Sequence, residues 1–526
     1  MHITLRPRQD GLRPASLPYA VLMLFLVVLA AASPAAAQDV LFDFEGPFLL
    51  DPGRTIKDHS LVFDDATQTW HAFYIRGVVG APNTTSEKEL GHAVSEDLRS
   101  WFILPSALTS TDGTFDERNT WAPFVVRNAA DDGWDMYYTG NDAQFLQRTG
   151  KATSVDLLEW TKLPANPILE PDSTVYLWSP DLEVPQLSAF RDPFFLEVDG
   201  EFNLLHTALV PDSTVGAGRR AVVHRSTSPD RVTWTESAPL AFSNSSEGPW
   251  REIESIQIVE HDGTWNMFFT LFGIQGVQWI QSDQFDAGWD FSQAEKIDMG
   301  IAAEVTPVAP GTWVFTRHIP LEHQTFHPSS GEIFFTLRAD TLRFDPVTKE
   351  PVIFPSDPLG TDWVERTGTA FVAAPTFGDN QLERGEPGVG AFGHGYLSSR
   401  EFYNGPLGTA GAIGALLGDE PIGSLTSRWF TIGPTDSLIT FRIAGTDSNA
   451  CRVELIERDP LDPAVTTVVR SSSPTGTNTM TTAQWDVRDL RGAEVRVSIV
   501  NDDTTGYIAV DHFRTWVEPT VPTSAP

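Results

Sequence analysis

Apolar and aromatic side chains recur along the first two thirds of the chain in short runs that are typical of β-strands. "SLVFDD" is followed by "WHAFYI", "PFVVRN" by "WDMYYTG", and "PFFLEVDG" by "EFNLLHTALV". These runs are rich in β-branched and aromatic residues, and polar turn residues separate the two members of each pair. The pattern therefore predicts a series of antiparallel hairpins.

A third run follows each hairpin and carries a repeated spacing. "GHAVSEDLRSW", "GKATSVDLLEW" and "VVHRSTSPDRVTW" all contain Ser-x-Asp-x-x-x-Trp. A fourth unit, beginning "SIQIVEHDGTWNMFFTLFG", keeps the first two runs, and a fifth, beginning "VTPVAPGTWVFTRH", is looser. Repeated short meanders are typical of propeller blades. We therefore predict an all-β chain with a five-bladed β-propeller over residues 39–355; a two-sheet sandwich would leave the repeat unexplained.

A second all-β region follows a stretch rich in proline and glycine near residues 356–368. Its strand-like runs include "SLITFRIAG", "CRVELIER", "VRVSIVN" and "YIAVDHFRTW". These runs predict a jelly-roll-like β-sandwich over residues 360–517, which would be an accessory domain. Residues 518–526 form a Pro/Thr tail that we expect to be disordered.

The first 37 residues have the pattern of a secretory signal peptide. Three arginines, Arg6, Arg8 and Arg13, precede the apolar run 20–32, and three alanines at 35–37 offer a cleavage site. The apolar run is shorter than a membrane span requires. We therefore expect an exported protein, extracellular or periplasmic, with no membrane span.

The charge and cysteine content exclude several classes of function. The formal net charge is −34, and so acidic a chain is a poor partner for nucleic acid or an anionic membrane. The only cysteine is Cys451, so no internal disulfide can form, and no motif supports thiol catalysis.

Three acidic residues occupy similar places in three of the repeated units. Asp58, Asp192 and Glu254 each lie seven to nine residues before the turn that ends the first run. The innermost strands of a propeller start at one mouth of the central channel, so we expect these carboxylates to converge there. Two aspartates and a glutamate around one pocket suit a glycosidase. For each residue taken alone, the alternative that it only anchors a loop remains open.

Several of these stretches resemble glycoside hydrolase family 32, the invertases, levanases and inulinases. The resemblance is carried by "GHAVSEDLRSWFILPSAL", "YTGND" with "GKATSVDLLEWTK", and "FRDP", and it covers nearly all of residues 50–320. "TWAPFVV" at 120–126 resembles instead family 43, the arabinosidases and xylosidases of the same clan. Both families imply a five-bladed propeller that acts on carbohydrate.

The resemblance implies a role for each matching residue. Asp58 is implied to be the nucleophile, Asp192 to stabilise the transition state, and Glu254 to be the acid/base. Arg191 is implied to hold the sugar, and Trp121 is assigned to substrate binding.

The chain departs from the family pattern at two places. "KDHS" stands where the family has Asn-Asp-Pro-Asn, and the cysteine that follows the family's acid/base is missing after Glu254. Glu252 competes closely with Glu254 as the acid, and Glu247 competes more weakly.

The sequence therefore predicts a secreted glycosidase that hydrolyses fructosyl linkages of an oligo- or polysaccharide with retention and without a required cofactor or a metal in the site. A family 43-like inverting arabinosidase or xylosidase is one alternative, and a non-catalytic carbohydrate-binding propeller is another. The second region resembles a carbohydrate-binding module. Asp511 and the "NDD" stretch at 501–503 offer oxygen ligands for a structural Ca²⁺ there, although solvated loop acids are the favoured explanation for "NDD".

Overall fold

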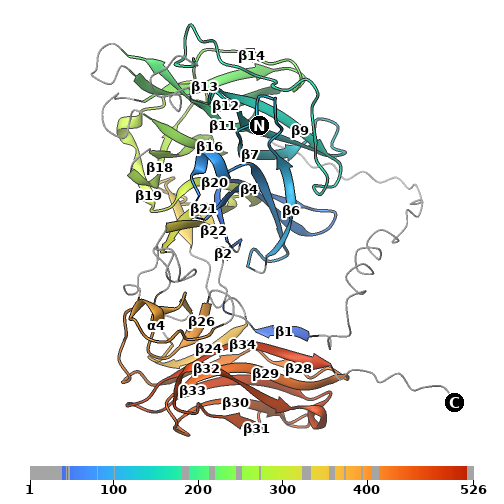
Figure 1. The fold of residues 1–526 in the computed structure, drawn as a ribbon, viewed down its shortest axis with the longest axis vertical. Helices are drawn as coiled ribbons and strands as arrows, with labels where there is room; N and C mark the ends of the chain where they lie inside the picture. Colours follow the sequence, from blue (N-terminus) through green and yellow to red (C-terminus); the bar gives the residue numbers. More distant parts are fainter. Residues whose placement is uncertain are drawn as a thin grey trace, which may run out of the picture.

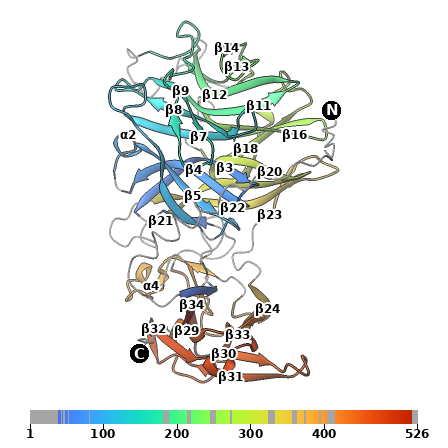
Figure 2. The ribbon, with the colours of Figure 1, turned by 90° about the vertical axis from the view of Figure 1, so that its right-hand side faces the viewer.

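The computed structural model contains two all-β bodies, a propeller at one end of the long axis and a sandwich at the other (Figures 1 and 2). None of the helices in the described ranges combines the length and the apolar character that crossing a membrane requires. The structure describes residues 38–517 except for residues 43, 45–47, 52, 80, 100, 180–188, 213–218, 244–251, 272–273, 323–332, 355–361, 372–374, 392–394, 402 and 404–413.

Five antiparallel sheets in the described part of the chain form the propeller. The first consists of β3 (Arg54–Asp64), β4 (Thr69–Val78), β5 (Glu89–Ser95) and β6 (Phe102–Thr109). The second consists of β7 (Asn119–Arg127), β8 (Trp134–Asn141), β9 (Gln147–Ser154) and β10 (Thr161–Lys162). The third consists of β11 (Phe190–Val198), β12 (Glu201–Pro211), β13 (Arg219–Ser228), β14 (Thr235–Glu236) and β15 (Ala241–Phe242).

The fourth sheet consists of β16 (Ile253–His261), β17 (Thr264–Leu271), β18 (Ile274–Ser282) and β19 (Glu295–Asp298). The fifth consists of β20 (Ile301–Ala309), β21 (Thr312–Glu322), β22 (Ile333–Phe344), β23 (Pro351–Phe354) and β2 (Phe48–Leu49). The innermost strands β3, β7, β11, β16 and β20 each contact the next, and β20 contacts β3, so the ring is closed. The predicted all-β, five-bladed architecture is confirmed.

The start of the chain completes the last blade. Strand β2 pairs with β22, with Leu49 opposite Leu337, although the two strands are almost 300 residues apart in the chain. Leu49 is buried with Leu337 and Ile56 between the first and last blades. This pairing gives the outer edge of β22 a partner and ties the fifth blade to the first.

Strand β1 (Gln38–Phe42) belongs to the other body, because it pairs with β34 (Ile508–Val517). The predicted propeller range of 39–355 therefore includes a strand of the sandwich. Phe42 and Phe44 are buried in the sandwich core. The chain thus contributes its first described strand to the sandwich before it enters the propeller.

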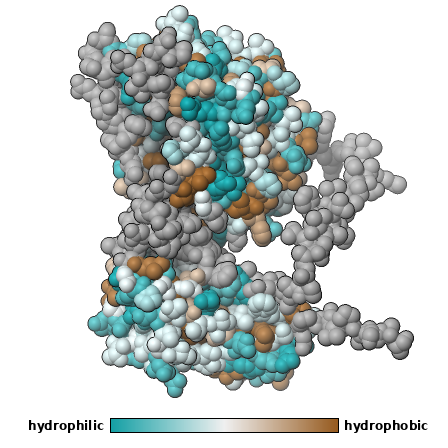
Figure 3. Space-filling view, in the orientation of Figure 1, coloured by the Kyte–Doolittle hydropathy of each residue, from teal (hydrophilic) through white to brown (hydrophobic). Residues whose placement is uncertain are grey.

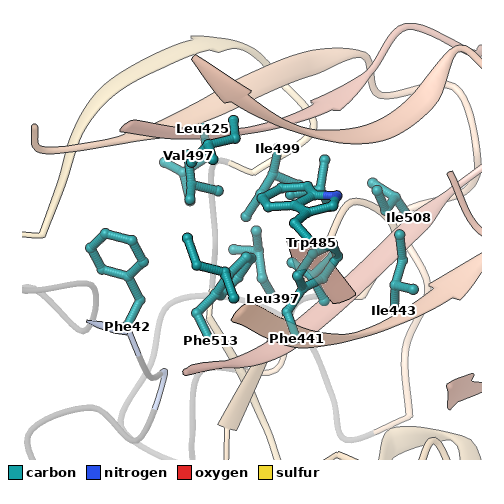
Figure 4. Packing of buried hydrophobic residues seen from close by; sticks show 14 of the residues in the cluster. Phe42, Leu397, Leu425, Phe441, Ile443, Trp485, Val497, Ile499, Ile508 and Phe513 are labelled. Carbon is teal, nitrogen blue, oxygen red and sulfur yellow. The ribbon is translucent and has the colours of Figure 1, made fainter. Parts of the chain in front are cut away.

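The sandwich consists of two sheets that pack face to face. One contains β25 (Thr376–Phe377), β26 (Gly395–Ser398), β34, β29 (Asp436–Gly445), β32 (Thr477–Asp486) and β1. The other contains β24 (Trp363–Gly368), β27 (Gly423–Ser427), β33 (Glu494–Asn501), β30 (Cys451–Arg458), β31 (Thr466–Ser472) and β28 (Phe430–Thr431). Figure 4 shows side chains of both sheets meeting in the core, among them Phe441, Trp485, Val497 and Phe513. The predicted sandwich is confirmed.

In the described part of the chain, four short helices lie between these strands. They are α2 (Asn83–Ser86), η3 (Phe291–Gln293), α4 (Asn380–Glu383) and η4 (Arg488–Leu490). Hydrophilic side chains cover most of the face drawn in Figure 3, in agreement with the acidic composition.

The repeated Ser-x-Asp spacing forms turns at the outer edge of three blades. Ser95 Oγ donates a hydrogen bond to Asp97 Oδ1 at 3.0 Å, and the same bond joins Ser228 to Asp230 at 3.0 Å. Asp230 also accepts backbone N–H groups within its own turn. These aspartates close turns between neighbouring strands, so this repeat marks the blades and carries no chemistry.

Candidate functional site

Each innermost strand has a β-bulge near its start, and the five bulges surround one small pocket. In β11, Arg191 pairs with Thr207 and Phe194 with Leu205, so two residues face one on the partner strand. The first extra residue has a positive φ in four blades: Ala122 at 44°, Asp192 at 59°, Ser255 at 54° and Ala302 at 49°. Bulges redirect side chains. The central pocket is lined by Asp58, His59, Ala122, Pro123, Phe124, Asp192, Pro193, Ser255, Ile256, Gln257, Ala302 and Ala303.

The bulge of the first blade is one residue shorter than the others. Lys57 pairs with Ile75 and His59 with Tyr74, so Asp58 is the only extra residue. This difference falls in the "KDHS" stretch that departs from the family pattern. Asp58 nevertheless occupies the same position in its blade as Asp192 in the third.

The environment of Asp58 favours its protonated form. Loss of solvent raises the pKa of Asp58 well above its ordinary value, and the negative charges of Asp192 and Glu254 raise it further. Lys57 opposes this rise in pKa, but its ammonium group is held 2.7 Å from Glu87 Oε1. Asp58 and Asp192 both line the central pocket, and Asp192 accepts the N–H of Ser255, the residue that follows Glu254, so the three predicted carboxylates lie close together.

Asp192 connects three blades. Its Oδ2 accepts hydrogen bonds from Thr207 Oγ1 at 3.1 Å and from the backbone N–H of Ser255 at 2.9 Å. Its own N–H donates to Thr139 Oγ1 in the second blade at 3.2 Å. Burial raises the pKa of Asp192, whereas Arg191 and these hydrogen bonds oppose the rise. Its carboxylate is therefore held rigidly at the pocket wall.

Glu254 lies one residue earlier in its strand than Asp192 does. Glu254 pairs with Thr270 across the sheet, just as Arg191 pairs with Thr207, so the counterpart of Asp192 is Ser255. Asp192 is eight residues before Gly200, whereas Glu254 is nine before Gly263. The sequence predicted that the three carboxylates occupy the same position in their blades. Glu254 lies one residue before that position, although all three carboxylates lie near the start of an innermost strand.

Arg191 is shared between two glutamates. Its Nη2 donates to Glu252 Oε1 at 2.6 Å and to Glu254 Oε1 at 2.8 Å, and all three residues lie near the start of β11 or β16. A second guanidinium, that of Arg219, lies 3.7 Å from Glu252 Oε2. Burial of charge is costly without such pairing, so these contacts hold Arg191 in one place beside the pocket.

The pKa of Glu254 is raised even though it accepts a hydrogen bond from arginine. Desolvation is the largest cause; Arg191 lowers the pKa, and the charges of Asp192 and Glu252 raise it. The Glu254 side chain is 30% exposed and that of Glu252 is 10% exposed; the described lining residues of the pocket include Ser255, the neighbour of Glu254, but not Glu254 itself. Glu254 is therefore better placed than Glu252 to donate a proton, and Glu247 lies outside the described residues.

Trp121 directly precedes the bulge of the second blade. It is partly buried against the core shared by the first two blades. Its neighbour Ala122 lines the central pocket, whereas Trp121 is not among the described lining residues. Its buried indole Nε1 has no hydrogen-bond partner among the described contacts. Sugar binding by Trp121 stays a prediction.

Sequence reasoning missed three threonines that hold the bulges. Thr139, Thr207 and Thr270 each lie opposite the residue before a bulge. Thr139 accepts the N–H of Asp192, and Thr270 accepts the N–H of Ala302 at 2.9 Å in the next blade. At the junction of the third and fourth blades, the corresponding N–H is that of Ser255, and the Asp192 carboxylate accepts it in place of a threonine. A threonine near the end of each second run, as in "YYTG", "LLHT" and "FFTL", is the signal that could have found them.

The acidic residues proposed for Ca²⁺ in the sandwich have protein partners. Asp502 pairs with Arg452 at 3.0 Å, Asp503 accepts from Thr505, and the amide of Asn501 donates to the carbonyl of Pro421. Within the described ranges, no group of three or more His, Cys, Asp or Glu residues is placed to hold a metal ion. A structural Ca²⁺ therefore stays a prediction.

Residues 61–300 match the family described as the Glycosyl hydrolases family 32 N-terminal domain. The insoluble isoenzyme CWINV5 of beta-fructofuranosidase from Arabidopsis thaliana is 29% identical over 191 residues, which are 34% of this chain and 30% of that protein. Beta-fructofuranosidase 1 from Zea mays is 38% identical over 87 residues, which are 15% of this chain and 13% of that protein. The chain thus matches under a third of the length of these relatives.

Among solved structures, fructan 1-exohydrolase IIa from Cichorium intybus in complex with 1-kestose aligns with a TM-score of 0.49 at 15% identity, over 90% of this chain and 97% of that one. A thermostable family-43 glycoside hydrolase aligns with a TM-score of 0.43 at 14% identity, over 58% of this chain and 94% of that one.

Proposed function

We propose that this chain, whose residues 61–300 form a family 32 glycoside hydrolase N-terminal domain, hydrolyses fructosyl linkages of an oligo- or polysaccharide with retention. One observation carries the proposal. Asp58, Asp192 and Glu254 come from three blades, and the charges of Asp192 and Glu254 both raise the pKa of Asp58 beside the central pocket. Two carboxyl groups that perturb each other next to a pocket are what glycoside hydrolysis requires.

In the first step, an oxygen of Asp58 attacks the anomeric carbon of the fructosyl unit; because the pKa of Asp58 is raised, this step draws on the form of the site in which Asp58 is ionised and Glu254 holds the proton. The bond from that carbon to the leaving oxygen breaks, and protonated Glu254 gives its proton to this oxygen. The products are a fructosyl ester of Asp58, a released alcohol and ionised Glu254. The raised pKa of Glu254 favours the protonated form that this step consumes.

In the second step, Glu254 accepts a proton from a water molecule whose oxygen attacks the same carbon. The ester bond to Asp58 breaks, which releases fructose and restores both carboxyl groups to their starting forms. Two inversions at one carbon give net retention.

Asp192 and Arg191 act on charge rather than on protons. Positive charge develops on the sugar ring as the bond to the leaving group breaks, and the buried Asp192 carboxylate stabilises it. The carboxylate accepts hydrogen bonds from Thr207 in its own blade and from Ser255 in the fourth, and the N–H of Asp192 donates to Thr139 in the second blade; these contacts fix Asp192 before the reaction begins. Arg191 offers a buried guanidinium that can bind sugar hydroxyls.

A comparison of substrates tests the proposal. The purified full chain is incubated with levan, inulin, sucrose, arabinan and xylan, and the released sugars are identified. We expect fructose from at least one of the first three and no pentose. Release of arabinose or xylose alone would favour the inverting alternative, and binding without release would favour a non-catalytic propeller.

A second measurement tests retention. With methanol as a competing acceptor, a retaining enzyme gives a methyl fructoside with the anomeric configuration of the substrate, whereas an inverting enzyme gives none of that anomer. Export also remains a proposal, because the predicted signal peptide, residues 1–37, lies outside the described residues.

A further inference from the structure

Arg191 presents a difficulty for the proposed acid. A guanidinium 2.8 Å from a carboxyl stabilises the ionised form and lowers its pKa. An acid that must be protonated near neutral pH should therefore not accept a hydrogen bond from an arginine. Yet the pKa of Glu254 is raised.

Desolvation is the largest cause of the raised pKa of Glu254, and Glu252 adds to it by weakening the opposing effect of Arg191. The same Nη2 of Arg191 that reaches Glu254 is 2.6 Å from Glu252 Oε1, so the shorter of its two contacts is to Glu252. Glu252 is buried and therefore weakly screened by solvent. Its negative charge offsets that of the guanidinium and also repels a charge on Glu254.

We propose that Glu252 is a positioning residue that occupies Arg191 and so keeps Glu254 protonated for catalysis. Glu252 does not touch the reacting atoms, and it acts through Arg191 and through its own charge. This inference rests on the proposed function and deepens it, because it names the group that adjusts the acid of the same site.

The other charged groups around the two glutamates come from three strands of two blades. Strand β3 contributes Asp58 and Lys57, β11 contributes Arg191 and Asp192, and β13 contributes Arg219, whose guanidinium lies 3.7 Å from Glu252. From β7 and β20 the described lining residues of the pocket are uncharged: Ala122, Pro123, Phe124, Ala302 and Ala303. Among these groups, Glu252 is the one that shares the Nη2 of Arg191 with Glu254 and so competes with Glu254 for the positive charge of the guanidinium.

The test is the pH profile of kcat/KM for fructosyl hydrolysis by the full chain. In Glu252→Gln, the amide oxygen still accepts a hydrogen bond from Arg191, but the negative charge is lost. The charge of Arg191 is then shared by Glu254 and Asp192 without Glu252, and the alkaline limb of the profile should move to lower pH by about one unit. Glu252→Asp keeps the charge and should leave the limb near its original position.

Arg219→Gln provides an independent arm that does not depend on the folding of Glu252→Gln. Removing this cation leaves more of the charge of Glu252 uncompensated, so the alkaline limb should move to higher pH. Glu260→Gln, at the other end of β16, is the matched control and should leave the limb unchanged, since the Glu260 side chain accepts the N–H of Gly263 in the exposed turn.

The possible outcomes separate the two proposals. An alkaline limb that stays in place in both Glu252→Gln and Arg219→Gln would overturn the positioning role. Loss of the limb in Glu252→Gln, with activity retained only on activated aryl fructosides, would make Glu252 the acid and would also overturn it. Absence of fructosyl hydrolysis by the wild type would instead contradict the proposed function.

Discussion

The carboxylate of Asp192 accepts the backbone N–H of Ser255 at 2.9 Å and so joins the third blade to the fourth. Ser255 is the bulge residue that follows Glu254, and Asp192 is the bulge residue that follows Arg191. The contact therefore fixes the distance between the two strands that carry the proposed acid and its arginine. The Asp192 carboxylate therefore both links two blades and lines the central pocket.

Replacement of Asp192 by asparagine separates these two roles. The amide oxygen can still accept from Ser255 and Thr207, but hydrogen bonds to a neutral acceptor are weaker, so we expect the free energy of unfolding to fall by about 1–2 kcal/mol. The kcat should fall about 10²–10³-fold with little change in KM, because the charge acts mainly in the transition state.

Thermal melting and kinetics on the same sample of Asp192→Asn measure both effects. Asp199→Asn, in the exposed turn at the end of β11, is the matched control and should change neither quantity. A large loss of stability with normal turnover in the folded fraction would make Asp192 a purely structural residue.

Removal of the Glu254 carboxyl should affect substrates according to their leaving groups. In Glu254→Ala, a natural fructoside needs a proton that is no longer supplied, and its turnover should fall about 10²–10⁴-fold. An activated aryl fructoside leaves without protonation and should lose much less in the first step. Initial rates on both substrates, with Glu260→Ala as the control, measure the difference, and an equal loss on both would remove Glu254 from the role of acid.

Glu304 should make the stability of the propeller depend on pH. It is buried at the junction of the fifth and first blades, where it accepts the N–H of Leu61 at 2.6 Å and the hydroxyl of Ser60 at 3.2 Å. Burial raises its pKa well above the ordinary value of 4.5. The folded state therefore holds this proton more tightly than the unfolded state does.

The direction of the pH effect follows from this raised pKa. The stabilising contribution of Glu304 is complete below about pH 4.5 and is lost as the pH rises through the folded-state pKa. Glu304→Gln cannot ionise, so its stability relative to the wild type should improve between pH 5 and pH 8. Melting temperatures of both proteins across this range test the expectation, and parallel pH curves would show that the pKa of Glu304 is not raised in the folded state.

Much of the fold could be predicted from the sequence because the blades repeat. Apolar runs recur in all five units and the Ser-x-Asp turn in three of them, and such local signals can be recognised without knowledge of distant contacts. The partner of β1 could not be predicted, because Val40 pairs with Arg514 across almost the whole chain. The sequence of a short strand does not indicate which sheet the strand joins.

The site could be predicted in outline but not in register. The number of residues between each carboxylate and the following turn places Asp58, Asp192 and Glu254 near the starts of their strands. A bulge adds residues to a strand, and this spacing does not reveal it. Thus Ser255 rather than Glu254 matches Asp192, and the first blade has a shorter bulge around Asp58. The sharing of Arg191 between Glu252 and Glu254 also depends on three-dimensional packing that the spacing does not reveal.

The most direct test of the central claim is fructose release by the wild type and by Asp58→Asn on the best substrate of the panel. The asparagine side chain keeps the shape of aspartate but is a far weaker nucleophile, so turnover should fall at least about 10³-fold while sugar binding, measured by calorimetry, persists. Asp65→Asn, in the exposed turn at the end of β3, should retain full activity. Equal turnover by the wild type and Asp58→Asn would contradict the account.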